Sequence, residues 1–300
     1  MSYRWVRVNF TTFMGDRRMR RLKILGIVLV LILFGTLTVA PLLFLFCGSL
    51  MGEPEITQYL VPILNGTKGY ASWRFFPLYP TLKSVVELVF DSPEFFQMFW
   101  NTMKITGGIL LGQLVFGMPS AWGLARYRIP GKGVFYLLYI ILMMLPFQVT
   151  MLSEYLVLSR LHMMDTLWAI IAPGAFSTFT VFLMYRFFCG IPEELLEAAR
   201  MDGAGEWKIF FFVGVPLGSA GILSALVIQF LECFSMIEQP LVFLQTKRLW
   251  PLSMYLPEIK EGQMGFALAC SFVALLPALC VFGMGQKYLE QGITAAAVKG

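Results

Sequence analysis

The sequence predicts an all-α membrane protein with six transmembrane helices. Hydrophobic residues make up 58% of the 300 residues and charged residues only 14%, whereas about a quarter of the residues in a soluble domain are charged. The apolar residues also gather in long runs that contain few charges. Because a bilayer core of about 30 Å is crossed by a helix of about 20 such residues, these runs predict membrane spans.

Six apolar runs are long enough to cross a bilayer. The first follows a basic stretch and no small-residue cleavage site follows it, so we expect a retained span rather than a signal peptide. The spans would form one transmembrane domain, residues 24–286, between an N-terminal segment, 1–23, and a C-terminal tail, 287–300. The predicted spans are residues 24–46, 99–124, 134–157, 167–189, 209–233 and 264–286.

The charges of the connecting segments predict an orientation. Seven basic residues and one acidic residue precede the first span, and the 125–133 loop contains three basic residues and no acidic one. The 47–98 loop instead contains three basic and five acidic residues. Because positive loops stay on the cytoplasmic side, we expect both termini, the 125–133 loop and the 190–208 loop there. The 47–98 loop would lie outside, ordered mainly by short turns at its prolines and glycines.

The composition argues against several other kinds of site. The number of cysteines is odd and no C-x-x-C pair occurs, which indicates free, mostly buried thiols rather than a disulfide or metal framework. His162 is the single histidine, and we expect a loop residue there and no metal site. The basic residues are unevenly placed, which argues against nucleic-acid binding. The cysteines are Cys47, Cys189, Cys233, Cys270 and Cys280.

The 190–208 loop, which begins GIPEELLEAARMDGAGE, predicts a short amphipathic helix. Gly190 breaks the fourth span, and Pro192 can begin a helix because its missing N–H is not needed in the first turn. Glu193 and Glu194 would lie at the positive end of the helix dipole. Gly203 would end the helix. Such a helix can be a docking element or a plain surface connection, and its spacing alone does not separate the two.

A longer pattern continues through this loop. It reads E-A-A, three residues, G, nine residues, then a hydrophobic residue, any residue, a hydrophobic residue and P. This pattern resembles the signature loop of ABC-importer permeases, with valine at 213 and 215 where the family more often has Ile and Leu. The resemblance implies that the helix at 193–203 couples to a groove on a cytoplasmic ATPase. The implied coupling residues are Glu197, Ala198, Ala199, Asp202 and Gly203.

Further stretches are similar to the carbohydrate-importer branch of that family. Asp202-Gly203-Ala204 resembles its version of the loop, and ARYRIPGKG at 125–133 resembles its second cytoplasmic loop. PTLKSVVELVF, followed by Asn101-Thr102, resembles its outer segment. The ending GQKYLEQGITAAAVKG resembles maltose-permease-like subunits, whose tail reaches the ATPases, which implies contacts by Lys299 and Gly300. The resemblance covers about residues 75–300.

The resemblance implies a type I ABC importer permease in a bacterial cytoplasmic membrane. Its partners would be a second permease subunit, an ATPase dimer, an extracytoplasmic solute-binding protein and the lipid bilayer. No G-x-x-x-x-G-K-[ST] motif occurs, so we expect no enzymatic activity and no cofactor in this chain. ATP and Mg²⁺ would bind the partner ATPase.

Polar side chains inside the spans are candidates for the solute path, because ionisable groups in a membrane are costly and are usually functional. A plainer interpretation of Lys104 is that its side chain extends to the membrane interface. Lys104 and Glu154 lie at similar depths in their predicted spans, so we also consider an ion pair between them. The family usually has proline and an aliphatic residue at Ser153 and Glu154, and Trp-Asn at Phe234-Ser235, which leaves the solute open. The candidates are Lys104, Gln113, Gln148, Glu154, Gln229 and Glu232.

The sequence leaves two alternatives to a carbohydrate importer open and argues against a third. The first is an importer of the same class with another small polar cargo, and the second is a membrane scaffold that transports nothing. The third, a membrane-embedded enzyme, would need clustered His, Asp or Cys residues at membrane depth, which the sequence lacks.

Overall fold

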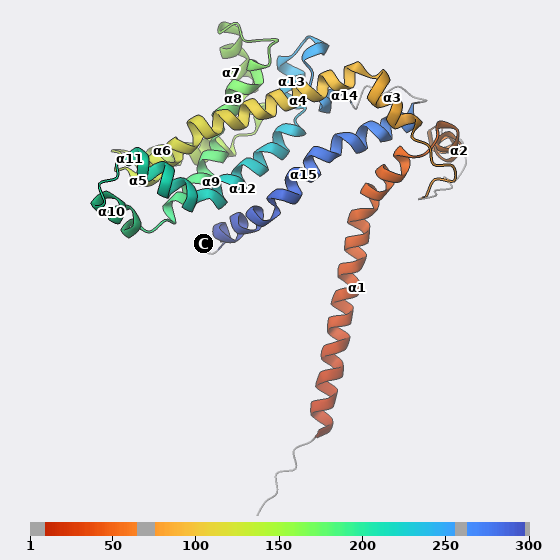
Figure 1. Cartoon of the computed structure of the whole chain (residues 1–300), viewed down its shortest axis with the longest axis horizontal. Coiled ribbons are helices and arrows are strands. Elements are labelled where there is room, and N and C mark those ends of the chain that lie inside the picture. Colours follow the sequence, from red (N-terminus) through yellow and green to blue (C-terminus); the bar gives the residue numbers. More distant parts are fainter. Residues whose placement is uncertain (1–9, 65–75, 256–262, 298–300) are drawn as a thin grey trace, which may run out of the picture. The chain divides into compact units, whose positions relative to one another are not determined.

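The computed structural model describes residues 10–64, 76–255 and 263–297 (Figure 1), and within these ranges every regular element is helical. The chain divides into two compact units. Unit 1 comprises the chain up to Val85 together with Met264–Phe272. Unit 2 comprises Val86–Gln263 together with the chain from Val273 onward. The tail residues Lys299 and Gly300 lie outside the described residues.

Unit 1 is built around the end of a long helix, α1, Phe10–Ser49. It is followed by α2, Glu53–Leu64. The Glu53 carboxylate accepts hydrogen bonds from the backbone N–H groups of Met264 (3.1 Å) and Gly265 (3.0 Å), which begin α15, Met264–Ala297. A carboxylate at this position satisfies N–H groups that have no partner within the helix, so Glu53 fixes the start of the last span.

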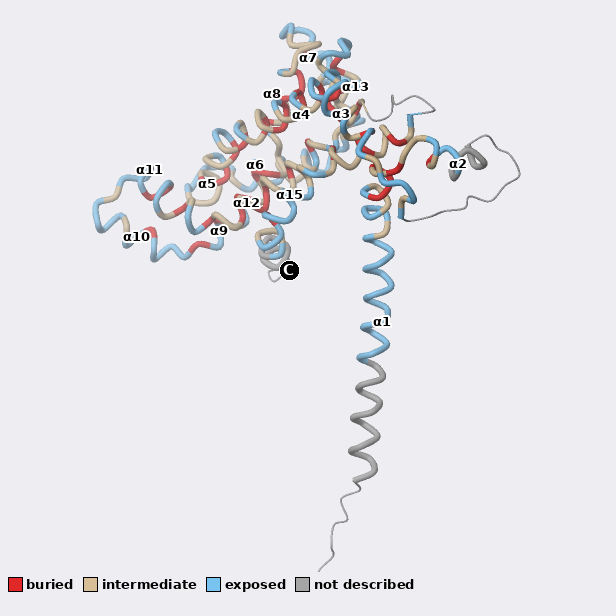
Figure 2. Tube along the Cα trace, turned by 45° about the vertical axis from the view of Figure 1, so that its right-hand side comes forward, coloured by how far each residue is buried: buried red, intermediate tan, exposed pale blue. Residues whose placement is uncertain are grey.

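Unit 2 consists of helices in which α9 has the central place. It packs against α5, α6 and α12, while α4 packs against α8, α12 and α14. Figure 2 shows buried residues recurring along α4, α8, α9 and α12. The elements are α3 (Lys83–Asp91), α4 (Pro93–Gly112), η1 (Gln113–Gly117), α5 (Met118–Arg126), α6 (Lys132–Met144), α7 (Phe147–Arg160), α8 (Trp168–Ala175), α9 (Thr178–Cys189), α10 (Glu193–Met201), α11 (Glu206–Ile209), η2 (Phe210–Gly214), α12 (Val215–Phe234), α13 (Glu238–Phe243), η3 (Lys247–Leu249) and α14 (Leu252–Tyr255).

Five helical segments of the described residues are long and apolar enough to cross a membrane, and they correspond to five of the six predicted spans. They are Ile24–Ser49, Pro93–Arg126, Trp168–Cys189, Glu206–Phe234 and Met264–Glu290. The third span, predicted as one helix over 134–157, is instead the pair α6 and α7, bent by 104°. The break falls at Leu145, which is extended (φ −75°, ψ 121°), because the residue before a proline is pushed out of the helical region.

The 47–98 loop was predicted to contain mainly turns, and this prediction is wrong for the described part of the loop. It holds all of α2 and α3 and the beginning of α4. Pro54 and Pro93 lie in the first turn of a helix, where the absent N–H has no acceptor to lose. Pro54, one of the prolines that suggested turns, therefore begins a helix, and so does Pro93.

Aromatic rings and glycines form the core of unit 2. Trp122 of α5 lies edge-on to Phe188 of α9, with ring centroids 5.2 Å apart. Glycines on the neighbouring helix let these rings approach, because a Cβ at Gly218 would lie 2.5 Å from the Phe188 ring and one at Gly221 2.1 Å from the Phe187 ring. The spacing of α9 and α12 therefore depends on the absence of side chains at these glycines.

Two spans contain a wide π turn immediately before a proline. Gln113–Gly117 precedes Pro119, and Phe210–Gly214 precedes Pro216. A proline inside a helix donates no hydrogen bond and its ring crowds the preceding turn, and a wider turn relieves that crowding. Pro216, the last residue of the pattern that begins with E-A-A, is thus preceded by a local change in helix pitch.

At the end of unit 2 formed by the 161–167 loop, Asp165 fastens two segments. Its carboxylate accepts hydrogen bonds from the Thr246 hydroxyl (2.6 Å) and from the backbone N–H groups of Gln245 (2.9 Å) and Thr246 (2.8 Å). These bonds, the Thr246 hydroxyl first, lower the pKa of Asp165. His162 and Asp165 both have φ near +55°, in the left-handed region that residues other than glycine seldom adopt.

Replacing Gly221 with alanine is expected to destabilise the protein. The new Cβ would overlap the Phe187 ring, and overpacking of a core costs about 1–3 kcal/mol. Gly283 of α15 is a matched control, since a Cβ there meets nothing within 4 Å and alanine gains up to ~1 kcal/mol in helix propensity. The melting temperature in detergent should fall for Gly221→Ala, and it should stay level or rise for Gly283→Ala. Equal shifts in both variants would contradict the packing argument.

Asp165 predicts a dependence of stability on pH. Its folded-state pKa lies below the ordinary value of 3.8, so its stabilising effect is complete above that value and is lost as the pH falls through the folded-state pKa. The melting temperature of the wild type should exceed that of Asp165→Asn at pH 7, and the difference should narrow as the pH approaches 3. Asparagine tolerates the positive φ. If the difference in melting temperature did not change with pH, the stabilisation would come from the shape of the side chain and not from its charge.

Candidate functional site

The helix predicted for the 190–208 loop is present as α10. Pro192 is its N-cap, and Glu193 and Glu194 lie in its first turn. At the other end Gly203 has φ +79°, and its N–H donates to the Arg200 carbonyl oxygen while the Ala204 N–H donates to the Ala199 carbonyl oxygen, both at 3.0 Å. This pair of bonds is the Schellman arrangement that ends helices at glycine.

One face of α10 is fixed in the core and another is free. Leu196 is fully buried in the cluster that contains Phe188 and Ile209, and Ala199 packs against the same cluster. The remaining predicted coupling residues are exposed, as is Met201, whose exposed fraction is 87%. The two alanines therefore do not share one free surface. The exposed predicted residues are Glu197, Ala198, Asp202 and Gly203.

A basic residue of the 125–133 loop anchors α10. Arg126, at the end of α5, donates to the carbonyl oxygens of Phe188 and Ile191 (2.6 Å for Ile191) and to the Glu193 carboxylate (3.1 Å). Its side chain is only 9% exposed, and its guanidinium lies 5.6 Å from the centroid of the Trp122 ring. A guanidinium has several fixed donors, which lets one residue cap the end of α9 and hold the beginning of α10.

Two further ion pairs extend this anchor. Arg200 binds Glu193 at 3.1 Å and Glu206, at the beginning of α11, at 2.9 Å. Hydrogen bonds to Glu206 and Glu193 raise the pKa of Arg200. Sequence reasoning did not select Arg126 or Arg200 as site residues. One feature of the sequence could have indicated Arg126. It begins a basic loop that is predicted to lie on the same side of the membrane as the 190–208 loop.

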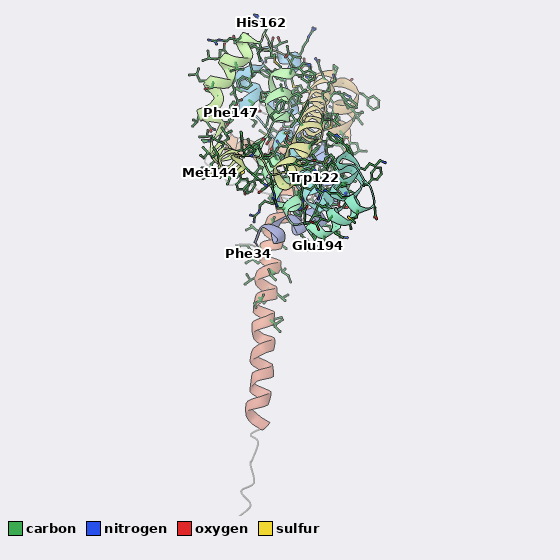
Figure 3. All side chains as sticks on the ribbon, turned by 90° about the vertical axis from the view of Figure 1, so that its left-hand side faces the viewer. Phe34, Trp122, Met144, Phe147, His162 and Glu194 are labelled. Atoms are coloured by element: carbon green, nitrogen blue, oxygen red, sulfur yellow. The ribbon has the colours of Figure 1, made fainter. Side chains whose placement is uncertain are left out.

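The two ends of unit 2 differ in what they carry. In Figure 1, α5, α10 and α11 gather at one end, and α7 and α13 gather at the other. Figure 3 shows the same separation, with His162 and Glu194 far apart and Met144 and Phe147 between them. The 125–133 and 190–208 loops therefore share one end, as their predicted common side requires.

Unit 2 also contains a cavity of about 440 Å³ beside the bend between α6 and α7. Three of the six predicted path residues line it, namely Glu154 of α7 and Gln229 and Glu232 of α12. Residues at the bend, Leu145 and Phe147, and at the junction of α8 and α9, Phe176 and Ser177, line this cavity. The polar lining residues are Thr150, Glu154, Ser177, Thr178, Gln229, Glu232 and Gln239.

The other three path candidates have different surroundings. Gln113 is fully buried and its amide donates to the Gly174 carbonyl oxygen at 3.0 Å. The Gln148 amide donates to the Glu238 carboxylate at 2.8 Å. Lys104 is exposed on α4 and does not pair with Glu154, which instead accepts a hydrogen bond from the Thr150 hydroxyl at 2.9 Å. The predicted Lys104–Glu154 pair is therefore not formed.

The free cysteines follow the prediction in part. Cys47, Cys233 and Cys270 are buried, whereas Cys189 and Cys280 are exposed in the isolated chain.

Comparison with known proteins decides the family. Residues 113–294 match the family described as "Binding-protein-dependent transport system inner membrane component". The chain belongs to this family. The matched region contains α10, its anchor Arg126 and all the polar residues that line the cavity.

Individual relatives agree over most of the chain. The chain is 27% identical over 267 residues to the arabinooligosaccharides transport system permease protein AraQ of Halalkalibacterium halodurans, covering 88% of this chain and 92% of that protein. It is also 27% identical to the sn-glycerol-3-phosphate transport system permease protein UgpE of Rhizobium meliloti, covering 88% and 94%. A crystal structure of a bacterial ABC transporter that imports the acidic polysaccharide alginate contains a chain with the same fold, with TM-score 0.77, 23% identity and coverage of 91% and 98%.

Replacing Arg126 with glutamine should loosen α10. The change removes the charged donor of several hydrogen bonds, and such bonds contribute about 1.5–3 kcal/mol each. Amide hydrogen exchange over residues 188–205 of the permease should accelerate by about tenfold or more, since 1.4 kcal/mol corresponds to a factor of ten. Arg128 is exposed in the same loop, so Arg128→Gln is the control. Unchanged exchange in Arg126→Gln would show that α10 is held by Leu196 packing alone.

Proposed function

We propose that this permease imports a carbohydrate and that α10 receives the mechanical input from a cytoplasmic ATPase. The complex would contain a second permease subunit, an ATPase dimer and an extracytoplasmic solute-binding protein. ATP and Mg²⁺ would bind the ATPase, and this chain would supply no cofactor. The chain would lie in a bacterial cytoplasmic membrane with both termini in the cytoplasm.

The observation that carries this proposal is the combination of a free face and a rigid anchor on α10. Glu197 is exposed and takes part in none of the ion pairs found among the described residues, so its carboxylate is available to a basic partner. The same helix is fixed by Leu196 and Arg126 to the core. A surface that must pass on a displacement needs both properties, because a loosely held helix would yield without moving the spans.

The anchor also indicates which spans would move. Arg126 joins α10 to α5, the short connection through Pro192 joins it to α9, and the Arg200–Glu206 pair joins it to α11 and so to α12. Displacement of α10 would therefore reach three spans together. Rocking of one packed group of helices against another is the usual basis of alternating access. Lys299 and Gly300 remain proposed as a second contact with the ATPases.

The carbohydrate cargo is supported by the loop sequence and by a relative. Asp202-Gly203-Ala204 resembles the carbohydrate branch, and one relative is named as a transporter of arabinooligosaccharides. The second candidate is another small polar solute, since an equally identical relative is named for sn-glycerol-3-phosphate. Purification of the tagged permease in mild detergent, with mass spectrometry of the bound proteins, is the first test. An ATPase and a second permease are expected, and a chain that purifies alone even after cross-linking would reject the proposal.

Glu197→Lys should leave the permease in the membrane and uncouple transport from ATP hydrolysis. The substitution reverses the charge at the exposed face of α10, so a basic partner surface would be repelled. Uptake should fall by at least tenfold, and less ATPase should co-purify. Glu94→Lys makes the same change at an exposed residue in the first turn of α4 and should retain the ATPase. Normal uptake by Glu197→Lys would remove α10 from the coupling mechanism.

A further inference from the structure

The charge of the membrane cavity restricts what can pass it. Among the described residues that line it, two are acidic, Glu154 and Glu232, and none is a lysine, arginine or histidine. Gln229, Gln239 and Thr150 add further polar atoms. The cavity thus combines carboxylates with amides and a hydroxyl, and offers no cation to neutralise an anionic solute.

Glu154 has an oxygen without a partner. Its Oε1 accepts the Thr150 hydroxyl at 2.9 Å, whereas its Oε2 is buried and has no hydrogen-bond partner. Buried polar atoms nearly always have partners, and an ionised carboxylate accepts hydrogen bonds but donates none. Glu154 lines the cavity, and its carboxylate accepts only the Thr150 hydroxyl among the described residues, so it keeps acceptor capacity that a solute hydroxyl can use.

The polar neighbours of the glutamates divide into fixed and free groups. Both polar atoms of the Gln229 amide form hydrogen bonds. Its Oε1 accepts from the Thr180 hydroxyl at 3.0 Å, and its Nε2 donates to the Cys233 sulfur at 3.2 Å. Glu232 lies one turn further along the same helix and forms none of the ion pairs found among the described residues. Gln229 thus fixes the wall, while Glu154 and Glu232 remain available to a solute.

Among the described residues that line the cavity, none is a cation that would compensate the two glutamates. Gln148 and Glu238 pair with each other nearby, which adds another carboxylate at this end of unit 2. Lys104, the basic residue predicted to pair with Glu154, is exposed on α4 and does not line the cavity. Like charges repel one another, so an anion entering the cavity would meet two carboxylates with no cationic side chain among the described lining residues.

We propose that this cavity is a solute-binding site for a polyhydroxylated solute that carries no negative charge. Hydroxyl groups of the solute would donate to Glu154 and Glu232, and uronates and sugar phosphates would be rejected. This inference rests on the proposed import function and adds the chemical class of the cargo. It separates this permease from the cargoes named for two of its relatives, alginate and sn-glycerol-3-phosphate.

The test measures the electrostatic character of the cavity directly. Ser177 lines it, so Ser177→Cys, in a chain whose five native cysteines are replaced by serine or alanine, reports access. In the purified complex, the labelling rate with a cationic methanethiosulfonate reagent is compared with the rate for an anionic reagent of similar size. The cationic-to-anionic ratio should fall by about tenfold or more when Glu154→Gln and Glu232→Gln are combined. Glu94→Gln, outside the cavity, should leave the ratio unchanged.

A ratio that is the same with and without the two glutamates would overturn the proposal. A second measurement addresses the cargo itself, using the complex with its solute-binding protein. Stimulation of ATP hydrolysis is compared for neutral oligosaccharides, amino sugars, oligogalacturonates and sn-glycerol-3-phosphate. Stimulation by the neutral or amino sugars is expected, and stimulation by the uronates or the phosphate would reject the inference. Failure of the import function would appear separately, as absence of an ATPase from the purified complex, while the labelling ratio can still be measured.

Discussion

The arrangement of unit 2 at the end that carries α10 depends on one buried guanidinium. A helix that ends leaves carbonyl oxygens without partners, and the next helix needs a fixed starting direction. Arg126 meets both needs, because it donates to carbonyl oxygens at the end of α9 and to Glu193 at the beginning of α10. The residues between α9 and α10 therefore form a defined connection, and α10 is held to a different span as well as to its own.

Close packing of glycines and rings makes that anchor stiff. Trp122 lies between Arg126 and the aromatic core, and Gly214 faces it where a Cβ would come within 2.6 Å of the ring. Such an interface has little freedom to slide, because interiors are packed as densely as organic crystals. Movement is more readily accommodated at the wide π turns and at the bend after Leu145, where the regular helix is already interrupted.

Local rules predicted the elements whose causes are local. The apolar runs placed five spans correctly, and Pro192 and Gly203 predicted both ends of α10, since capping depends on neighbouring residues. The bend before Pro146 was accessible to the same rules but was outweighed by the length of the apolar run. The polar pairings were not predictable. Gln113 bonds to a helix 61 residues away, and no spacing within one span shows which way a glutamine will turn.

The anchor has a consequence for the construction of hybrid transporters. Residues 190–208 form one continuous loop between two spans, so a graft could be cut at those spans. In this chain that segment lacks the donor of its anchoring hydrogen bonds, because the guanidinium that fixes it belongs to α5. A graft of residues 190–208 onto another permease would bring acceptors without their donor. The smallest exchangeable piece is therefore discontinuous, and consists of that loop together with the end of α5.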